Sequence, residues 1–146
     1  MKAVGAIFVI LALVIGIVPQ FTDCQSQGRS LTLDNGKTVP MKCHWSAEAA
    51  IATAVPLGTM GILMALSKRK ETRRMIGISA GVLGAATILI PTALIGVCAS
   101  SDMLCNMILR PTLVLSGSLA ILTSIFVLFT QFRPEELPYD LHPAGA

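Results

Sequence analysis

The residues best suited to chemistry lie together in Met41–Glu48, a stretch that precedes a long apolar run. It contains a thioether, a thiol, an imidazole and a carboxylate, and His44 and Glu48 share one face if the helix begins early. Sulfur donors select Cu(I), and an imidazole can hold haem iron. The predicted ligand set is Met41, Cys43, His44, Glu48 and Met103. No metal-binding spacing is present, so no cofactor is required, and copper or haem is a hypothesis.

Four cysteines form the second group that could do chemistry: Cys24, Cys43, Cys98 and Cys105. Thiols outside a bacterial membrane tend to be oxidised, and four cysteines allow three pairings. We favour Cys24 with Cys43 and Cys98 with Cys105, because each bond closes one loop and does not require two loops to dock. A cysteine in such a bond cannot bind a metal.

The composition indicates which elements must position these groups. Of 146 residues 53% are hydrophobic and only 13% are charged, and the mean hydropathy is +0.74, which is too apolar for a soluble domain. Roughly 20 apolar residues cross a bilayer. Such spans are predicted at residues 3–19, 47–66, 75–97 and 107–132. The sequence therefore predicts an all-α membrane protein, a four-helix bundle that forms a single domain over residues 1–146.

The basic residues predict the orientation of the bundle. Five cationic side chains lie in residues 67–74, and the positive-inside tendency places this loop in the cytoplasm. Both termini, including the tail 133–146, are then cytoplasmic, and loops 20–46 and 98–106 face outward. We expect a multi-pass protein of the cytoplasmic membrane, with the first span retained and ended by Pro19. The net charge of +3 comes mainly from this loop and does not indicate nucleic-acid binding.

The first outer loop is predicted to form a β-hairpin. Leu31–Leu33 and Thr38–Val39 flank Asn35 and Gly36, which favour a tight turn. A lone hairpin is marginal in water. A disulfide between Cys24 and Cys43 across its base would contribute about 3 kcal/mol.

Two charged residues lie inside the apolar runs, Glu48 and Arg110. Such charges are costly in a membrane, so either they pair at the outer end of the bundle or each extends to the interface. Met41–His44 and Met103–Asn106 show a similar pattern, with Glu48 and Arg110 each five residues past a cysteine, as in an internal repeat. Trp45 suits an aromatic anchor at the outer interface.

The topology resembles that of the membrane quinone-dependent disulfide oxidoreductases, which also combine four spans with cysteine pairs near the outer side. Those enzymes use a Cys-x-x-Cys pair. Here the intervening segments are much longer, between Cys24 and Cys43 and between Cys98 and Cys105. The resemblance implies thiol-disulfide exchange as a function, without the motif that would carry it.

The Met-x-Cys-His-Trp motif of residues 41–45 resembles a family of small four-span bacterial and archaeal membrane proteins of unknown function. That resemblance implies association with an ABC-type transporter or another permease, and no catalytic residue. We therefore predict a non-enzymatic accessory or scaffold subunit that contacts another membrane protein, or a second copy of itself, within the lipid bilayer. His44, Trp45, Glu48 and Arg110 are its candidate contact residues. The alternative is an extracytoplasmic copper or haem binder, and the third hypothesis is a thiol-disulfide oxidoreductase.

Overall fold

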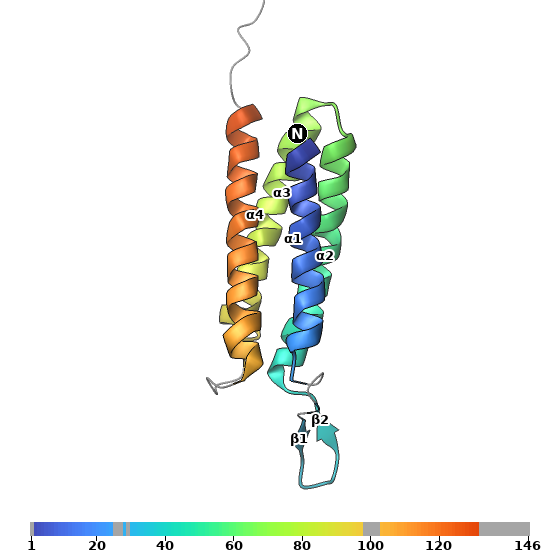
Figure 1. The fold of residues 1–146 in the computed structure, drawn as a ribbon, viewed down its shortest axis with the longest axis vertical. Helices are drawn as coiled ribbons and strands as arrows, with labels where there is room; N and C mark the ends of the chain where they lie inside the picture. The colour runs from blue at the N-terminus through green and yellow to red at the C-terminus, as the bar shows by residue number, and fades with distance from the viewer. Residues whose placement is uncertain (1, 25–27, 29, 98–102, 132–146) are drawn as a thin grey trace, which may run out of the picture.

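The computed structural model describes residues 2–24, 28, 30–97 and 103–131, and it has the predicted four-helix architecture (Figure 1). The helices run alternately up and down. They are α1 (Lys2–Thr22), α2 (Lys42–Leu66), α3 (Lys70–Leu89) and α4 (Arg110–Gln131). Two π-helical turns, η1 (Ile90–Leu94) and η2 (Cys105–Leu109), continue α3 and lead into α4. The ends of α1 and α3 thus meet the starts of α2 and η2, and we call this the cysteine end.

Each helix is long and apolar enough to cross a membrane. The four candidate spans contain 21 to 27 residues with mean hydropathies of 1.8 to 2.5. Large apolar side chains face outward along their lengths, for example Ile10, Val55, Val82 and Leu119. Such a surface would be unstable in water and is stable against lipid. The chain is therefore a multi-pass membrane protein.

The bundle is built from two closely packed helix pairs. In the first pair, a Cβ atom added to Gly5 would lie 2.6 Å from the carbonyl oxygen of Gly61, and one added to Gly61 would lie 2.9 Å from that of Gly5. In the second pair, the corresponding distances between Gly84 and Gly117 are 2.9 and 2.7 Å. Only glycine permits this approach of two backbones. We call α1 with α2 the first helical hairpin and α3 with α4 the second.

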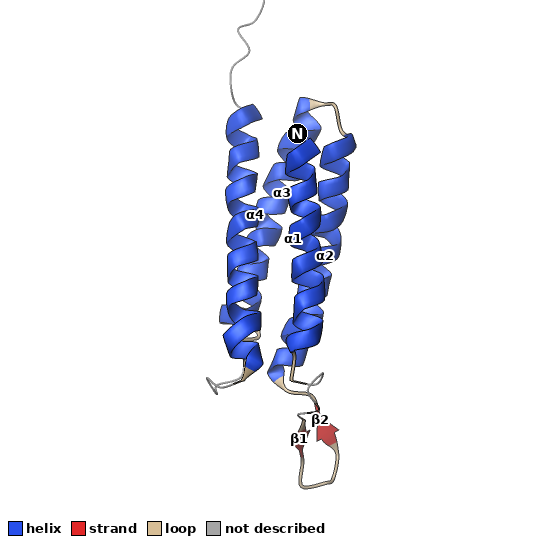
Figure 2. Ribbon diagram, in the orientation of Figure 1, coloured by secondary structure: helices blue, strands red, loops and turns tan. Residues whose placement is uncertain are grey.

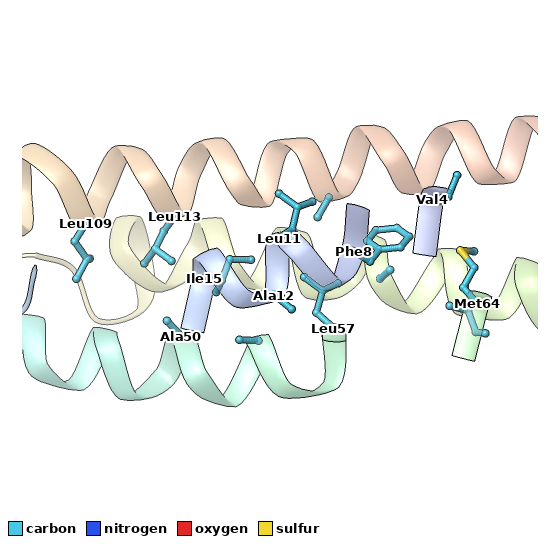
Figure 3. Close-up of a cluster of buried hydrophobic side chains, with 14 of the residues drawn as sticks. Val4, Phe8, Leu11, Ala12, Ile15, Ala50, Leu57, Met64, Leu109 and Leu113 are labelled. Carbon is cyan, nitrogen blue, oxygen red and sulfur yellow. The ribbon is translucent and has the colours of Figure 1, made fainter. Parts of the chain in front are cut away.

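The core between the pairs is apolar and contains side chains from all four helices, and Figure 3 shows part of it. Phe8 and Ile15 of α1, Leu57 of α2 and Leu113 of α4 have no exposed surface. Between α2 and α3, the hydroxyl of Thr87 also lies 3.5 Å from that of Thr53. This core joins the two helical hairpins and fixes the position of their cysteine ends.

The predicted β-hairpin is confirmed and projects away from the cysteine end (Figure 2). Strand β1 (Leu31–Thr32) pairs antiparallel with β2 (Thr38–Val39). The turn is longer than a two-residue turn. Gly36 donates its N–H to the Leu33 carbonyl and has a φ of 72°, while Asn35 does not have a positive φ. This is the three-residue type of hairpin loop, in which only the glycine adopts the left-handed conformation.

Several helix ends lie beyond the predicted apolar spans, whereas the third helical segment stops at Leu94, before the predicted end at residue 97. Helix α1 continues through Pro19 to Thr22, so the prediction that Pro19 ends it is wrong. Helix α2 begins at Lys42, five residues before the predicted span, because Lys42 and His44 lower the apparent hydropathy of a turn that is nevertheless helical. Pro91 lies in η1, where a π-turn accommodates the missing backbone N–H. The motif of residues 41–45 is therefore mostly helical.

Candidate thiol site

Three cysteines that are far apart in the sequence meet at the cysteine end. The Sγ atoms of Cys24, Cys43 and Cys105 all lie within 4.8 Å of one another. Cys24 Sγ is 2.7 Å from Cys43 Sγ and 3.7 Å from Cys105 Sγ. All three residues are buried, with exposures of 3%, 0% and 1%. We call these residues the thiol cluster.

Three separate segments position the thiol cluster. Cys24 lies two residues past the end of α1, Cys43 is the second residue of α2, and Cys105 is the first of η2. Ser46 of α2 donates its hydroxyl to the Gly96 carbonyl at 2.8 Å and so ties the first helical hairpin to the end of the second. The described parts of the two outer loops therefore lie together, although the predicted pairing did not require them to dock.

Docking brings Cys105 against Cys24, a contact that the sequence analysis did not predict. The predicted pair of Cys24 and Cys43 lies together in the structure, while a bond between them stays a prediction. Cys98, the predicted partner of Cys105, lies outside the described residues.

An acidic residue that the sequence analysis missed accompanies the thiol cluster. Asp23 Oδ2 lies 3.2 Å from His44 Nδ1, and the two side chains are 8% and 25% exposed. Asp23 precedes Cys24 and His44 follows Cys43, so this contact joins the two segments that carry those thiols. Since Asp23 belongs to no motif or periodic pattern, only its position beside Cys24 could have indicated its role.

The other predicted contact residues do not join the site. Glu48 and Arg110 are both exposed, and the structure records no ion pair between these two described residues. The predicted pairing is thus absent, which leaves the alternative that each side chain extends to the interface. Trp45 is 57% exposed, and its ring lies edge-on to that of His44, with 5.9 Å between centroids.

The predicted metal ligands are only partly assembled. Met41 and Met103 are half-buried and pack against the apolar core, which includes the thiol cluster. Of the predicted set, Glu48 is exposed, and His44 Nδ1 faces Asp23. The structure instead adds Cys24 and Cys105 to Cys43, so thiols are the main potential ligands.

Fold and site together define a class: a membrane four-helix bundle with three clustered thiols at one end. The chain belongs to the family described as a domain of unknown function (DUF4418), whose model matches residues 4–130. This confirms the predicted resemblance to a family of unknown function. No curated protein and no solved structure matches the chain.

Proposed function

We propose that this protein carries out thiol-disulfide exchange through the thiol cluster. The single observation that carries the proposal is the position of Cys24, whose sulfur is within 3.7 Å of two other cysteine sulfurs. A disulfide with a purely structural role needs only two cysteines. Here a disulfide between Cys24 and Cys43 would leave the thiol of Cys105 against it, which is the arrangement that exchange requires.

The internal step is a balanced exchange. The Cys105 thiolate attacks Cys24 Sγ, and its electron pair forms the Cys24–Cys105 bond. The Cys24–Cys43 bond breaks, and its electron pair stays on Cys43 Sγ, which binds the proton that Cys105 lost. No net oxidation occurs, and the disulfide moves from within the first helical hairpin to a position between the two hairpins.

Exchange with an external dithiol adds a redox function. Two electrons and two protons pass from the dithiol to the cluster disulfide, so that the dithiol becomes a disulfide and two cluster cysteines become thiols. A membrane quinone, the acceptor class used by the oxidoreductases with similar topology, would then remove those electrons. The sequence analysis ranked this function third because Cys-x-x-Cys is absent. In the structure, the fold brings the cysteine sulfur atoms as close together as that motif would have done.

The exchange can be tested by cutting the chain between the helical hairpins. A specific protease site is inserted between Lys68 and Arg69, in the loop that links α2 and α3, with Cys98 replaced by serine. Thiols are blocked by alkylation, the chain is cleaved, and the fragments are separated in denaturant without reductant. A Cys24–Cys43 bond lies within one fragment, whereas a Cys24–Cys105 bond links the two.

We expect both free and linked fragments, in a ratio that a glutathione buffer resets from either starting state. Cys105→Ser should abolish the linked product and Cys43→Ser should make it predominant. In Cys24→Ser, any linked fragments must come from a bond between Cys43 and Cys105, so this variant measures that bond separately. Failure of Cys43→Ser to form linked fragments under an oxidant would contradict the proposal.

Copper binding is the second candidate, and the burial of three thiols whose sulfur atoms lie within 4.8 Å of one another favours it. Cu(I) prefers such soft donors, and it would require all three cysteines to be reduced. Metal analysis of the reduced protein separates the candidates. The metal site would be favoured if one copper per chain is retained, if Cys24→Ser loses it, and if the bound copper protects the thiols from alkylation. Haem binding through His44 stays a prediction without a further supporting contact.

The accessory-subunit hypothesis and the orientation also stay proposals. We retain the cytoplasmic membrane as the location, with the cysteine end outside and both termini inside, because the five cationic side chains of residues 67–74 favour the cytoplasmic side. This orientation places the thiol cluster in an oxidising compartment. The apolar face of the β-hairpin supports a contact with another protein. Leu31 is paired with Val39, and Leu33 follows on the same face; their exposures are 56%, 41% and 49%.

A further inference from the structure

Arg110 is a charged residue near the outer end of a membrane span, where its guanidinium needs an anion or water as a neighbour. The continuous helix from Cys105 to Gln131 has 27 residues, so at 1.5 Å per residue it is about 40 Å long. The hydrocarbon core is about 30 Å thick, so a centred helix extends about 5 Å beyond it at each end. Arg110 lies about 7.5 Å along the helix from Cys105, close to this boundary, and its long side chain can reach the phosphate level.

The protein itself supplies no anion to Arg110 within the part of the chain that the structure describes. There, no carboxylate oxygen is recorded within 4.0 Å of its guanidinium. Glu48, the one acidic residue in a predicted span, is exposed and does not pair with it. A guanidinium at a membrane boundary is stable against an anion or water, so a ligand from outside the chain is expected to occupy this position.

Arg110 is exposed and lines an open surface pocket. The pocket has a volume of about 490 Å³ and is lined by Thr92, Asn106, Arg110, Pro111 and Val114. Thr92 belongs to η1 and Asn106 to η2, so both π-helical turns contribute to its lining. π-turns occur frequently at functional sites, where they redirect side chains.

The polar groups of the pocket suit a phosphodiester. The Arg110 guanidinium can donate two parallel hydrogen bonds to phosphate oxygens, and the Asn106 amide can donate another. Thr92 already donates its hydroxyl hydrogen to the Ile88 carbonyl at 2.7 Å, so its oxygen remains an acceptor for a hydroxyl group of a headgroup. Val114 and Pro111 provide apolar surface beside these groups.

We propose that Asn106 and Arg110 bind the phosphate group of a membrane phospholipid in the leaflet at the cysteine end, and that Thr92 accepts a hydrogen bond from a hydroxyl of its headgroup. The site is separate from the thiol cluster, and the inference does not depend on thiol-disulfide exchange. Inorganic phosphate shares the same chemistry, and the experiment distinguishes the two sources.

The experiment measures lipid retained by the full-length protein in native mass spectrometry. The probes are phosphatidylglycerol, diacylglycerol with the same acyl chains but no phosphate, and inorganic phosphate. We expect one retained phosphatidylglycerol per chain and no comparable retention of diacylglycerol. Arg110→Gln should reduce retention at least fivefold, and Arg110→Lys should give an intermediate value because lysine keeps the charge but not the two-pronged geometry.

Lys42→Gln is the matched control, since Lys42 is an exposed cation at the same end and does not line the pocket. Its retention should equal that of the unmodified protein. Equal losses in Lys42→Gln and Arg110→Gln, or no loss in Arg110→Gln, would overturn the proposal. Binding of inorganic phosphate that depends on Arg110 and excludes the lipid would overturn the assignment to a phospholipid.

Discussion

Cys24 is the residue on which the proposed chemistry depends, because it contacts one cysteine of its own helical hairpin and one of the other. Its neighbour Asp23 contacts His44, the residue that follows Cys43, and so strengthens the link between the segments that carry Cys24 and Cys43. The same two segments are thus joined twice, once through sulfur and once through a polar contact. Asp23 and His44 are therefore positioning residues for Cys24 and Cys43.

A comparison of two carboxylates tests this role. Asp23→Asn weakens the contact with His44 and should lower the free energy of unfolding by about 1 kcal/mol. Glu48→Gln removes an exposed charge that has no recorded ion-pair partner among the described residues, and should change it by less than about 0.5 kcal/mol. Unfolding of both variants in one detergent measures the difference. A larger loss in Glu48→Gln would mean that Glu48 and Arg110 pair after all.

At this scale the sequence predicts residue types better than residue contacts. The cysteines and His44 were recognised because thiols and imidazoles are rare in so apolar a chain. The contact between Cys24 and Cys105 could not be predicted, since it depends on how two loops dock. The absent pairing of Glu48 with Arg110 has a similar reason, because the direction in which a helical residue points depends on the packing of the whole bundle.

The helices form two pairs because small residues let their backbones approach. The requirement is strongest at Gly5 with Gly61 and at Gly84 with Gly117, where an added Cβ would meet a backbone carbonyl. Gly16 differs, because a Cβ there would meet only the Ala54 methyl group at 3.4 Å. The sequence contains these glycines, but it does not show which of them contact a neighbouring helix.

Two alanine substitutions test this packing. Gly61→Ala should lower the free energy of unfolding by about 1 to 3 kcal/mol, because the backbones of α1 and α2 must separate. Gly16→Ala should be neutral or stabilising by up to about 1 kcal/mol, because alanine favours helix more than glycine does. Thermal unfolding in the same detergent provides the comparison. Equal effects would show that the approach at Gly61 does not hold the pair together.

For the molecule as a whole, the orientation in the membrane determines whether its thiols can be oxidised. Hydropathy predicted the number of helices correctly because lipid requires long apolar spans. The helix ends were predicted less well, because polar residues such as Lys42 continue a helix past the apolar run. The basic loop provides the only argument for sidedness.

Sidedness can be measured with single introduced cysteines. Thr38→Cys, in the exposed β-hairpin, should react in intact cells with a membrane-impermeant maleimide, and Ser67→Cys should react only after permeabilisation. The native cysteines of the described part are buried and provide a low background. Labelling of Ser67→Cys alone in intact cells would place the thiol cluster in the cytoplasm and remove the basis for its oxidation.

The most direct test is to map the bonds of Cys24 in the unmodified chain. Intact cells are treated with an alkylating reagent, and the protein is digested without reductant and analysed by mass spectrometry over a series of applied redox potentials. We predict that Cys24 is found bonded to Cys43 and to Cys105, in proportions that change with potential. A single, unchanging partner for Cys24 at every potential would contradict thiol-disulfide exchange.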